Sequence, residues 1–96
     1  MNQIDLNGQA AVITGGAQGI GFAIARRLVA SGGRVSLWDM NGQLLASAAK
    51  ELGEAASTVT VDITDYAAVE AAVAETEKRL GRIDILVHSA GIAGKN

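Results

Sequence analysis

Apolar residues along this chain gather in short runs that alternate with segments of helical spacing. Four runs are rich in Val, Ile or Leu and lack a clean polar alternation, which favours strands that are covered on both faces. They predict strands over residues 10–14, 34–39, 58–62 and 83–88. Between them, apolar residues recur three or four positions apart, which predicts helices over about residues 19–30, 41–52, and from 64 or 65 to just before Gly81.

Local signals mark the ends of these helices. Gly32 and Gly33 end the first helix, Asn41 is a good N-cap for the second, and Gly53 stops the second. The side chains expected to face the core, helix by helix, are Ile20, Ile24 and Leu28, then Leu44, Leu45, Ala48 and Leu52, then Tyr66, Val69, Val73 and Leu80.

Strands and helices therefore alternate in the order βαβαβαβ. Right-handed crossovers turn such a chain into a parallel sheet. We predict an α/β fold, a Rossmann-like parallel sheet with strand order 3-2-1-4, in a single domain over residues 1–96.

A glycine-rich segment lies where the first strand gives way to the first helix. It reads Thr14-Gly15-Gly16-Ala17-Gln18-Gly19-Ile20-Gly21. The pattern Thr-Gly-x-x-x-Gly-x-Gly fits it fully, whereas Gly-x-Gly-x-x-Gly fits in no register. Unpaired N–H groups and the positive dipole end at a helix N-terminus bind phosphate, and glycine lets the backbone approach. The segment predicts a site for a dinucleotide pyrophosphate, and the alternative is a tight turn without a ligand.

Asp39 ends the second strand, 18 residues beyond Gly21. A carboxylate at this spacing can accept hydrogen bonds from the adenosine ribose hydroxyls, and it would repel a 2′-phosphate. No Arg or Lys stands at Gln18, Met40 or Asn41 to compensate. This favours NAD over NADP, and the alternative is that Asp39 merely caps the next helix.

Composition and charge narrow the classes of function. The net charge is −2 and the charges are scattered, so there is no basic stripe for nucleic acid. Cysteine is absent, which excludes disulfides, thiolate metal sites and cysteine nucleophiles. The first residues are polar, unlike a secretory signal, and no window approaches the ~18 apolar residues of a membrane helix. We expect a soluble cytoplasmic protein without a metal site or a membrane partner.

Three further groups of residues complete a family pattern with the glycine segment. They are Asp39, Val61-Asp62-Ile63-Thr64-Asp65, and Ser89-Ala90-Gly91. From about residue 6 to 91 the chain resembles the N-terminal half of a short-chain dehydrogenase/reductase of the single-domain branch. Gln18 argues against the extended branch, which has glycine at that position. The resemblance implies a partial dinucleotide-binding domain whose cofactor is NAD.

The resemblance also implies roles for individual residues. The backbone from Gly15 to Ile20 would cradle the pyrophosphate, Asp62 would accept a hydrogen bond from the adenine amino group, and Ile63 would pack beside the ring. Ala90 and Gly91 would pass under the nicotinamide-side ribose. The expected cofactor-binding residues are Thr14, Gly15, Gln18, Gly19, Ile20, Gly21, Asp39, Met40, Asp62, Ile63, Ser89, Ala90 and Gly91. A simpler interpretation of Asp62 is a turn carboxylate.

The sequence departs from the family pattern at two points. His88-Ser89 stands where the family usually has two Asn, and we expect His88 to be a structural strand-end residue. The family's chemistry needs a Tyr and a Lys four residues later, but Tyr66 is followed at that spacing by Glu70 and looks like a core residue. Asn96 is not expected to be the family's catalytic Asn. We therefore expect no catalytic residues and no turnover by this chain alone.

Two other functions stay open at this point. The chain could be a truncated homologue that binds a nucleotide or a partner without chemistry, or it could bind S-adenosylmethionine through a similar glycine turn, although the spacing of the turn speaks against that. An alcohol or ketone substrate is expected only for a full-length form. Ile85, Leu86 and Val87 would lie on an open apolar sheet edge, which predicts self-association or a partner that supplies the missing strands.

Overall fold

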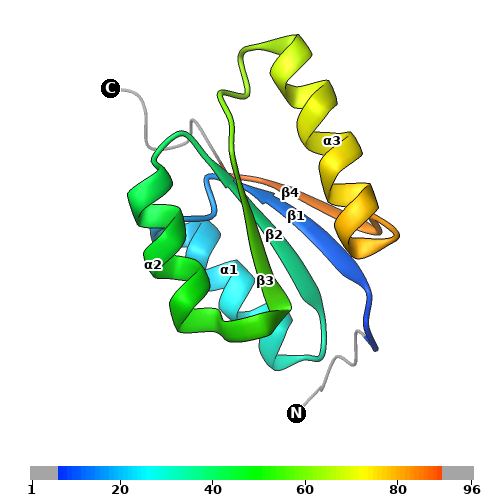
Figure 1. The fold of residues 1–96 in the computed structure, drawn as a ribbon. Helices are drawn as coiled ribbons and strands as arrows, with labels where there is room; N and C mark the ends of the chain where they lie inside the picture. The colour runs from blue at the N-terminus through cyan, green and yellow to red at the C-terminus, as the bar shows by residue number, and fades with distance from the viewer. Residues whose placement is uncertain (1–6, 90–96) are drawn as a thin grey trace.

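A computed structural model describes residues 7–89 of the chain. Its elements are β1 (Ala10–Thr14), α1 (Gly19–Ala30), β2 (Arg34–Asp39), α2 (Gly42–Leu52), a 3₁₀ turn (Gly53–Ala55), β3 (Ala56–Thr60), α3 (Tyr66–Leu80) and β4 (Ile85–His88). The four strands form one parallel sheet in the order β3-β2-β1-β4 (Figure 1). The predicted α/β fold and the predicted strand order are confirmed.

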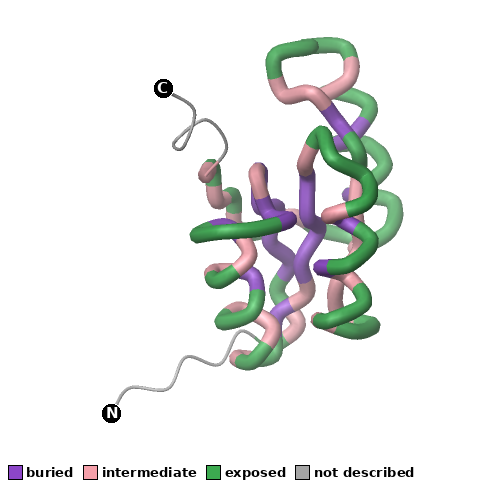
Figure 2. Tube along the Cα trace, turned by 90° about the vertical axis from the view of Figure 1, so that its left-hand side faces the viewer, coloured by how far each residue is buried: buried purple, intermediate pink, exposed green. Residues whose placement is uncertain are grey.

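The sheet lies between two unequal helical layers. Helices α1 and α2 cover one face, and α3 covers the other within the described residues (Figure 1). Successive side chains along a strand point to opposite faces of the sheet. Ile13 and Leu37 therefore pack toward α1 and α2, whereas Val12 and Trp38 pack toward α3. The buried residues follow the middle strands in Figure 2, which places the core along β1 and β2.

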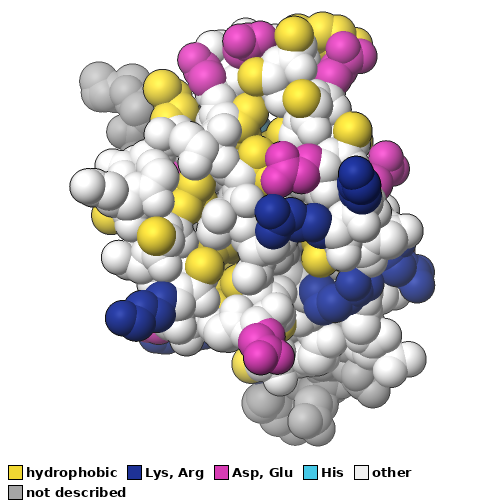
Figure 3. All heavy atoms as spheres, in the orientation of Figure 1, with side chains coloured by type: hydrophobic (Ala, Val, Ile, Leu, Met, Phe, Trp, Pro, Cys, Tyr) yellow, Lys and Arg dark blue, Asp and Glu magenta, His cyan; other side chains and the backbone are white. Residues whose placement is uncertain are grey.

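Strand β3 begins two residues before the predicted start and ends at Thr60. Its register is set by β2, since Val35 pairs with Ala56 and Asp39 pairs with Thr60. Ala56 and Ser57 are therefore in a strand because they pair with β2, although both residue types have little intrinsic preference for strands. The residues of β3 are half-buried or exposed, as expected of an edge strand. Hydrophobic side chains reach the surface along this edge, between α2 and α3 (Figure 3).

Three of the side chains expected in the core are exposed instead. Ile20 is 64% exposed and Tyr66 is 77% exposed, because each stands in the first turn of a helix that begins beyond the strand ends. The interpretation of Tyr66 as a core residue is therefore wrong. Val73 is 37% exposed because α3 buries Ala72 and Thr76, which turns Val73 to the flank of the helix. By contrast, Leu45 and Ala48 are buried, and Leu28, Leu44 and Leu52 pack against them as predicted.

A charged cluster joins the strands at the amino edge of the sheet. Asp84 accepts a hydrogen bond from the backbone N–H of Ala10 at 2.8 Å and pairs with the guanidinium of Arg82 at 2.8 Å. Hydrogen bonds from Arg82 and then Ala10 hold the pKa of Asp84 below its usual value. The backbone N–H of Asp84 still donates to the carbonyl oxygen of Ala10 at 2.8 Å, but the N–H of Ala10 is taken by the Asp84 side chain, and β4 begins at Ile85 rather than at residue 83.

Candidate functional site

The residues predicted to bind a cofactor converge on the carboxyl edge of the sheet. All four strands are parallel, so Thr14, Asp39, Thr60 and His88 end them at the same edge. The glycine turn, the Asp39–Met40 pair, the Asp62–Ile63 pair and Ser89 follow these ends directly. In open α/β sheets the ligand crevice lies outside this edge. The predicted residues Ala90 and Gly91 lie outside the described residues.

The glycine turn is anchored by its backbone. The N–H groups of Gly15 and Gly16 donate to the carbonyl oxygen of Trp38 on β2, at 2.7 and 3.3 Å. Gly15 has a φ of +66° and Gly19 a φ of +63°, in the left-handed region that favours glycine. The turn is therefore bent by two glycines and fixed to the neighbouring strand before α1 begins.

Helix α1 begins without a side-chain cap. Its N-cap residue Gln18 is extended and accepts no hydrogen bond through its side chain, and no acidic residue stands in the first turn. By contrast, Asn41 caps α2 by accepting from the N–H of Leu44, and Asp65 caps α3 by accepting from the N–H of Ala68. Within residues 7–89, no N-cap side chain therefore occupies the first N–H groups of α1, and these groups and the positive dipole end can receive an anion.

The glycines of this turn meet different surroundings. A Cβ at Gly16 would lie 2.9 Å from the carbonyl oxygen of Ile13, and one at Gly21 would overlap the carbonyl oxygen of Gly15. Glycine at position 16 lets the turn pack closely on Ile13 and Leu37, and glycine at position 21 lets the first turn of α1 lie close to Gly15. A Cβ at Gly19 would meet no atom of the described residues within 4 Å. The space beyond Gly19 is therefore open, and it lies directly over the free end of the helix.

Thr14 ties the ends of β1 and β4 together. Its hydroxyl lies 2.9 Å from Nδ1 of His88 and accepts the backbone N–H of Ser89 at 3.2 Å. The hydroxyl of Ser89 in turn donates to the carbonyl oxygen of Thr14 at 2.5 Å. Thr14 is buried, so its part in the site is to hold the strand ends in place. His88 makes a structural contact at the strand end, as expected.

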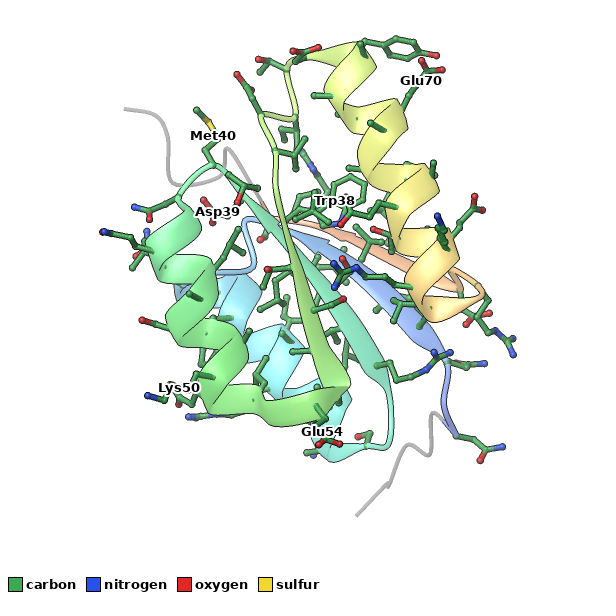
Figure 4. All side chains as sticks on the ribbon, viewed as in Figure 1. Trp38, Asp39, Met40, Lys50, Glu54 and Glu70 are labelled. Carbon is green, nitrogen blue, oxygen red and sulfur yellow. The ribbon has the colours of Figure 1, made fainter. Side chains whose placement is uncertain are left out.

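Asp39 stands at the end of β2 with one carboxylate oxygen partly engaged. Its Oδ1 accepts the backbone N–H of Asn41 at 3.2 Å. The N-cap of α2 is Asn41 rather than Asp39, so the alternative interpretation of Asp39 as the helix cap is wrong. Beside it, Met40 is 67% exposed, and Figure 4 shows both residues at the upper end of β2.

Asp62 closes a turn after β3. Its Oδ1 accepts from the hydroxyl of Thr64 at 2.7 Å and from the backbone N–H of Thr64 at 2.9 Å. These two hydrogen bonds hold the pKa of Asp62 below its usual value, so the group is a carboxylate at neutral pH. The turn interpretation is confirmed for Oδ1. Ile63, next along the chain, packs against the cluster that contains Trp38 and Val61.

One residue that anchors this edge was not among the predicted site residues. Trp38 holds the glycine turn through its carbonyl oxygen, and a backbone acceptor of this kind can be supplied by any residue type. The only available signal was its place on the strand directly before Asp39.

Two kinds of feature are not found in the part of the chain that the structure describes. Among residues 7–89, no group of three or more His, Asp or Glu side chains is placed to hold a metal ion. In the same range, every helix is too short or too polar to cross a membrane.

A family of proteins and several curated relatives match this chain. The family described as short chain dehydrogenase matches residues 9–96. The chain is 47% identical over 87 residues to a 2-dehydro-3-deoxy-L-rhamnonate dehydrogenase (NAD(+)) of Sphingomonas sp. (strain SKA58). It is 44% identical over 87 residues to a sorbitol dehydrogenase of Cereibacter sphaeroides. Each match covers 91% of this chain and 34% of the relative, so the chain spans about a third of the length of these relatives.

Solved structures share the fold over most of the chain. A 3-ketoacyl-(acyl-carrier-protein) reductase from Brucella melitensis, complexed with NADH, matches with a TM-score of 0.83 and 36% identity, covering 85% of this chain and 34% of that one. An actinorhodin polyketide ketoreductase with NADPH matches with a TM-score of 0.85 and 37% identity, covering 95% of this chain and 36% of that one.

Proposed function

The chain belongs to the short chain dehydrogenase family, and from this premise we propose that the carboxyl edge of its sheet binds a nicotinamide dinucleotide for an oxidoreductase. The observation that carries the proposal is the start of α1, which lacks a side-chain cap and has open space beyond Gly19. A pyrophosphate fits both features, because it offers anionic acceptors and needs a close backbone. The backbone from Gly15 to Ile20 would hold it.

We propose NAD(H) rather than NADP(H) as the cofactor. Asp39 would accept hydrogen bonds from the ribose hydroxyls, and the exposed Met40 beside it brings no positive charge. At ~4 Å, each unit charge of a 2′-phosphate would cost about 1 to 4 kcal/mol against this carboxylate. One solved neighbour holds NADH and another NADPH, so the preference rests on Asp39.

The remaining predicted residues would hold the two ends of the cofactor. The Asp62 carboxylate is charged at neutral pH and can accept the adenine amino group, while Ile63 offers an apolar surface to the ring. Ser89, Ala90 and Gly91 stay predicted for the nicotinamide side.

We propose an alcohol or carbonyl compound as the substrate of a full-length form. The bound cofactor supplies the hydride chemistry, and this chain's residues bind and orient it. Tyr66 is the only tyrosine, is exposed, and has Glu70 rather than Lys four residues later. We therefore assign no catalytic residue here and expect no turnover by this chain alone. A cytoplasmic location and a single partial domain over residues 1–96 belong to the same proposal.

A non-catalytic nucleotide-binding or interaction module is the second candidate function. The observation that favours it is the apolar Leu86 on β4, which is 67% exposed and could meet a partner. Joining a catalytic half from a relative and assaying hydride transfer separates the two, because an interaction module would not support turnover.

Calorimetric titration with NADH, NADPH and S-adenosylmethionine tests the proposed function. We expect NADH to bind at one site per chain, NADPH to bind more weakly, and S-adenosylmethionine not to bind. Tighter binding of S-adenosylmethionine than of NADH would contradict the proposal, as would the absence of binding by either dinucleotide.

We also expect the isolated chain to self-associate or to need a partner. Among the described strands, β4 pairs only with β1, and Leu86 on β4 is 67% exposed. Open edges with exposed apolar side chains pair with other chains. Light scattering at micromolar concentration should give a mass above that of the monomer, and Leu86→Lys should lower it. A wild-type chain that stays monomeric and unfolds cooperatively would show this expectation to be wrong.

A further inference from the structure

Trp38 takes part in two sections of the candidate site. Its carbonyl oxygen accepts the N–H groups of Gly15 and Gly16, so its backbone anchors the glycine turn. Its side chain is 4% exposed and lies on the α3 side of the sheet, in a cluster with Val61 and Ala72 (Figure 4). Backbone and side chain of one residue thus reach the two regions where a dinucleotide's pyrophosphate and adenine would lie.

The segment from Val61 to Ile63, here called the adenine wall, rests on this cluster. Val61 is buried in it, and Ile63 packs against it. The start of the wall is fixed to β2, because the N–H of Val61 donates to the carbonyl oxygen of Asp39 at 2.9 Å. Asp62, the proposed hydrogen-bond acceptor for the adenine amino group, lies between these two apolar residues. The height of its carboxylate above the sheet therefore depends on what fills the space below.

The indole of Trp38 belongs to the cluster on which the adenine wall rests, and its orientation is fixed. Its Nε1 donates to the hydroxyl of Ser36 at 3.0 Å, and that hydroxyl lies 3.4 Å from the hydroxyl of Thr76 on α3. All three residues are buried. Because an unpaired buried polar group is costly, this chain of contacts opposes rotation of the ring. It also links the indole to α3, the helix that follows the adenine wall.

On the basis of the cofactor site proposed above, we propose that Trp38 is a positioning residue for the adenine end of the dinucleotide. Its indole sets the adenine wall against the glycine turn that its own carbonyl oxygen anchors. A smaller side chain would let the wall sink toward the sheet while the backbone anchor remained. The main consequence is a loss of discrimination by Asp62, and the loss of overall binding is smaller.

The test compares NADH with reduced nicotinamide hypoxanthine dinucleotide, whose base lacks the amino group. The wild-type chain should prefer NADH by about tenfold, since a hydrogen bond to a carboxylate is lost with the analogue. Trp38→Leu should reduce this preference to about threefold or less. Trp38→Phe keeps an aromatic ring but lacks the N–H, so it should give an intermediate ratio. If Trp38→Leu does not fold, Trp38→Phe provides the test. Partial unfolding scales both apparent affinities together, so the ratio reports position rather than stability.

Val35→Ala is the matched control. Val35 is buried on the same strand but packs on the face of α1 and α2, away from the adenine wall. The Val35→Ala variant should lower the stability of the fold and leave the ratio of the two affinities unchanged. If the wild-type chain binds neither dinucleotide, the proposed function fails and this inference with it. If the wild-type chain prefers NADH and both Trp38 variants keep the full preference, only the role of Trp38 is overturned. The role of Trp38 is also overturned if the wild-type chain binds NADH and the hypoxanthine analogue with equal affinity.

Discussion

Gly19→Val should lower the affinity of the chain for NADH by about 100-fold. The added side chain would enter the open space over the N-terminus of α1, where nothing lies within 4 Å of a Cβ. It would displace the pyrophosphate from the first N–H groups of the helix. Two hydrogen bonds to a charged group, at roughly 1.5 kcal/mol each, account for a loss of that size. Calorimetric titration of the variant with NADH measures it.

Gly81→Val separates this effect from backbone strain. Gly81 has a φ of +81° and equally open surroundings, and it follows α3 at the amino edge, on the other side of the sheet from the site. Both variants force valine into the left-handed region, which costs on the order of 1 to 3 kcal/mol of stability. Only Gly19→Val should weaken NADH binding. Equal losses in the two variants would mean that the turn at Gly19 does not hold the cofactor.

The double variant Asp39→Ala with Met40→Arg should move the cofactor preference toward NADPH by on the order of 100-fold. The change removes a carboxylate beside the ribose and adds a guanidinium that can pair with a 2′-phosphate. Together these terms are worth about 3 kcal/mol at surface dielectrics. The ratio of the dissociation constants of NADH and NADPH, from titrations at equal ionic strength, is the quantity to compare.

Glu54→Ala provides the control for a general change of charge. Glu54 is exposed near the start of β3, at the opposite end of the molecule from Asp39 and Met40 (Figure 4). The variant removes one negative charge, as Asp39→Ala does by itself, and should leave the ratio as in the wild-type chain. The role of Asp39 would be refuted by a wild-type chain that binds NADPH as tightly as NADH.

The sequence was sufficient for the order of the sheet and the place of the site. Parallel strands with right-handed crossovers leave few arrangements, and the strand ends then bring the glycine turn, Asp39 and Asp62 to one edge. The N-cap of α2 was also predictable, because the Asn41 side chain accepts a hydrogen bond from a nearby backbone N–H. These features depend on local chemistry or on topology.

Features that depend on tertiary packing were not predictable in the same way. The burial of Tyr66 and Val73 depends on where α3 begins and which of its faces meets the sheet, and apolar spacing alone gave the wrong answer. The early start of β3 follows from its register with β2. The anchoring of the glycine turn by Trp38 uses a carbonyl group, which leaves no mark on residue type.

Mapping the amide resonances of the chain by nuclear magnetic resonance during titration with NADH tests the central claim most directly. Binding at the glycine turn should shift the amides of Gly19, Ile20 and Gly21 most, with smaller shifts at Asp39 and Asp62. The amide of Gly81, at the amino edge, should stay in place. The largest shifts at the amino edge, or no shifts at saturating NADH, would contradict the assignment of the carboxyl edge as a dinucleotide site.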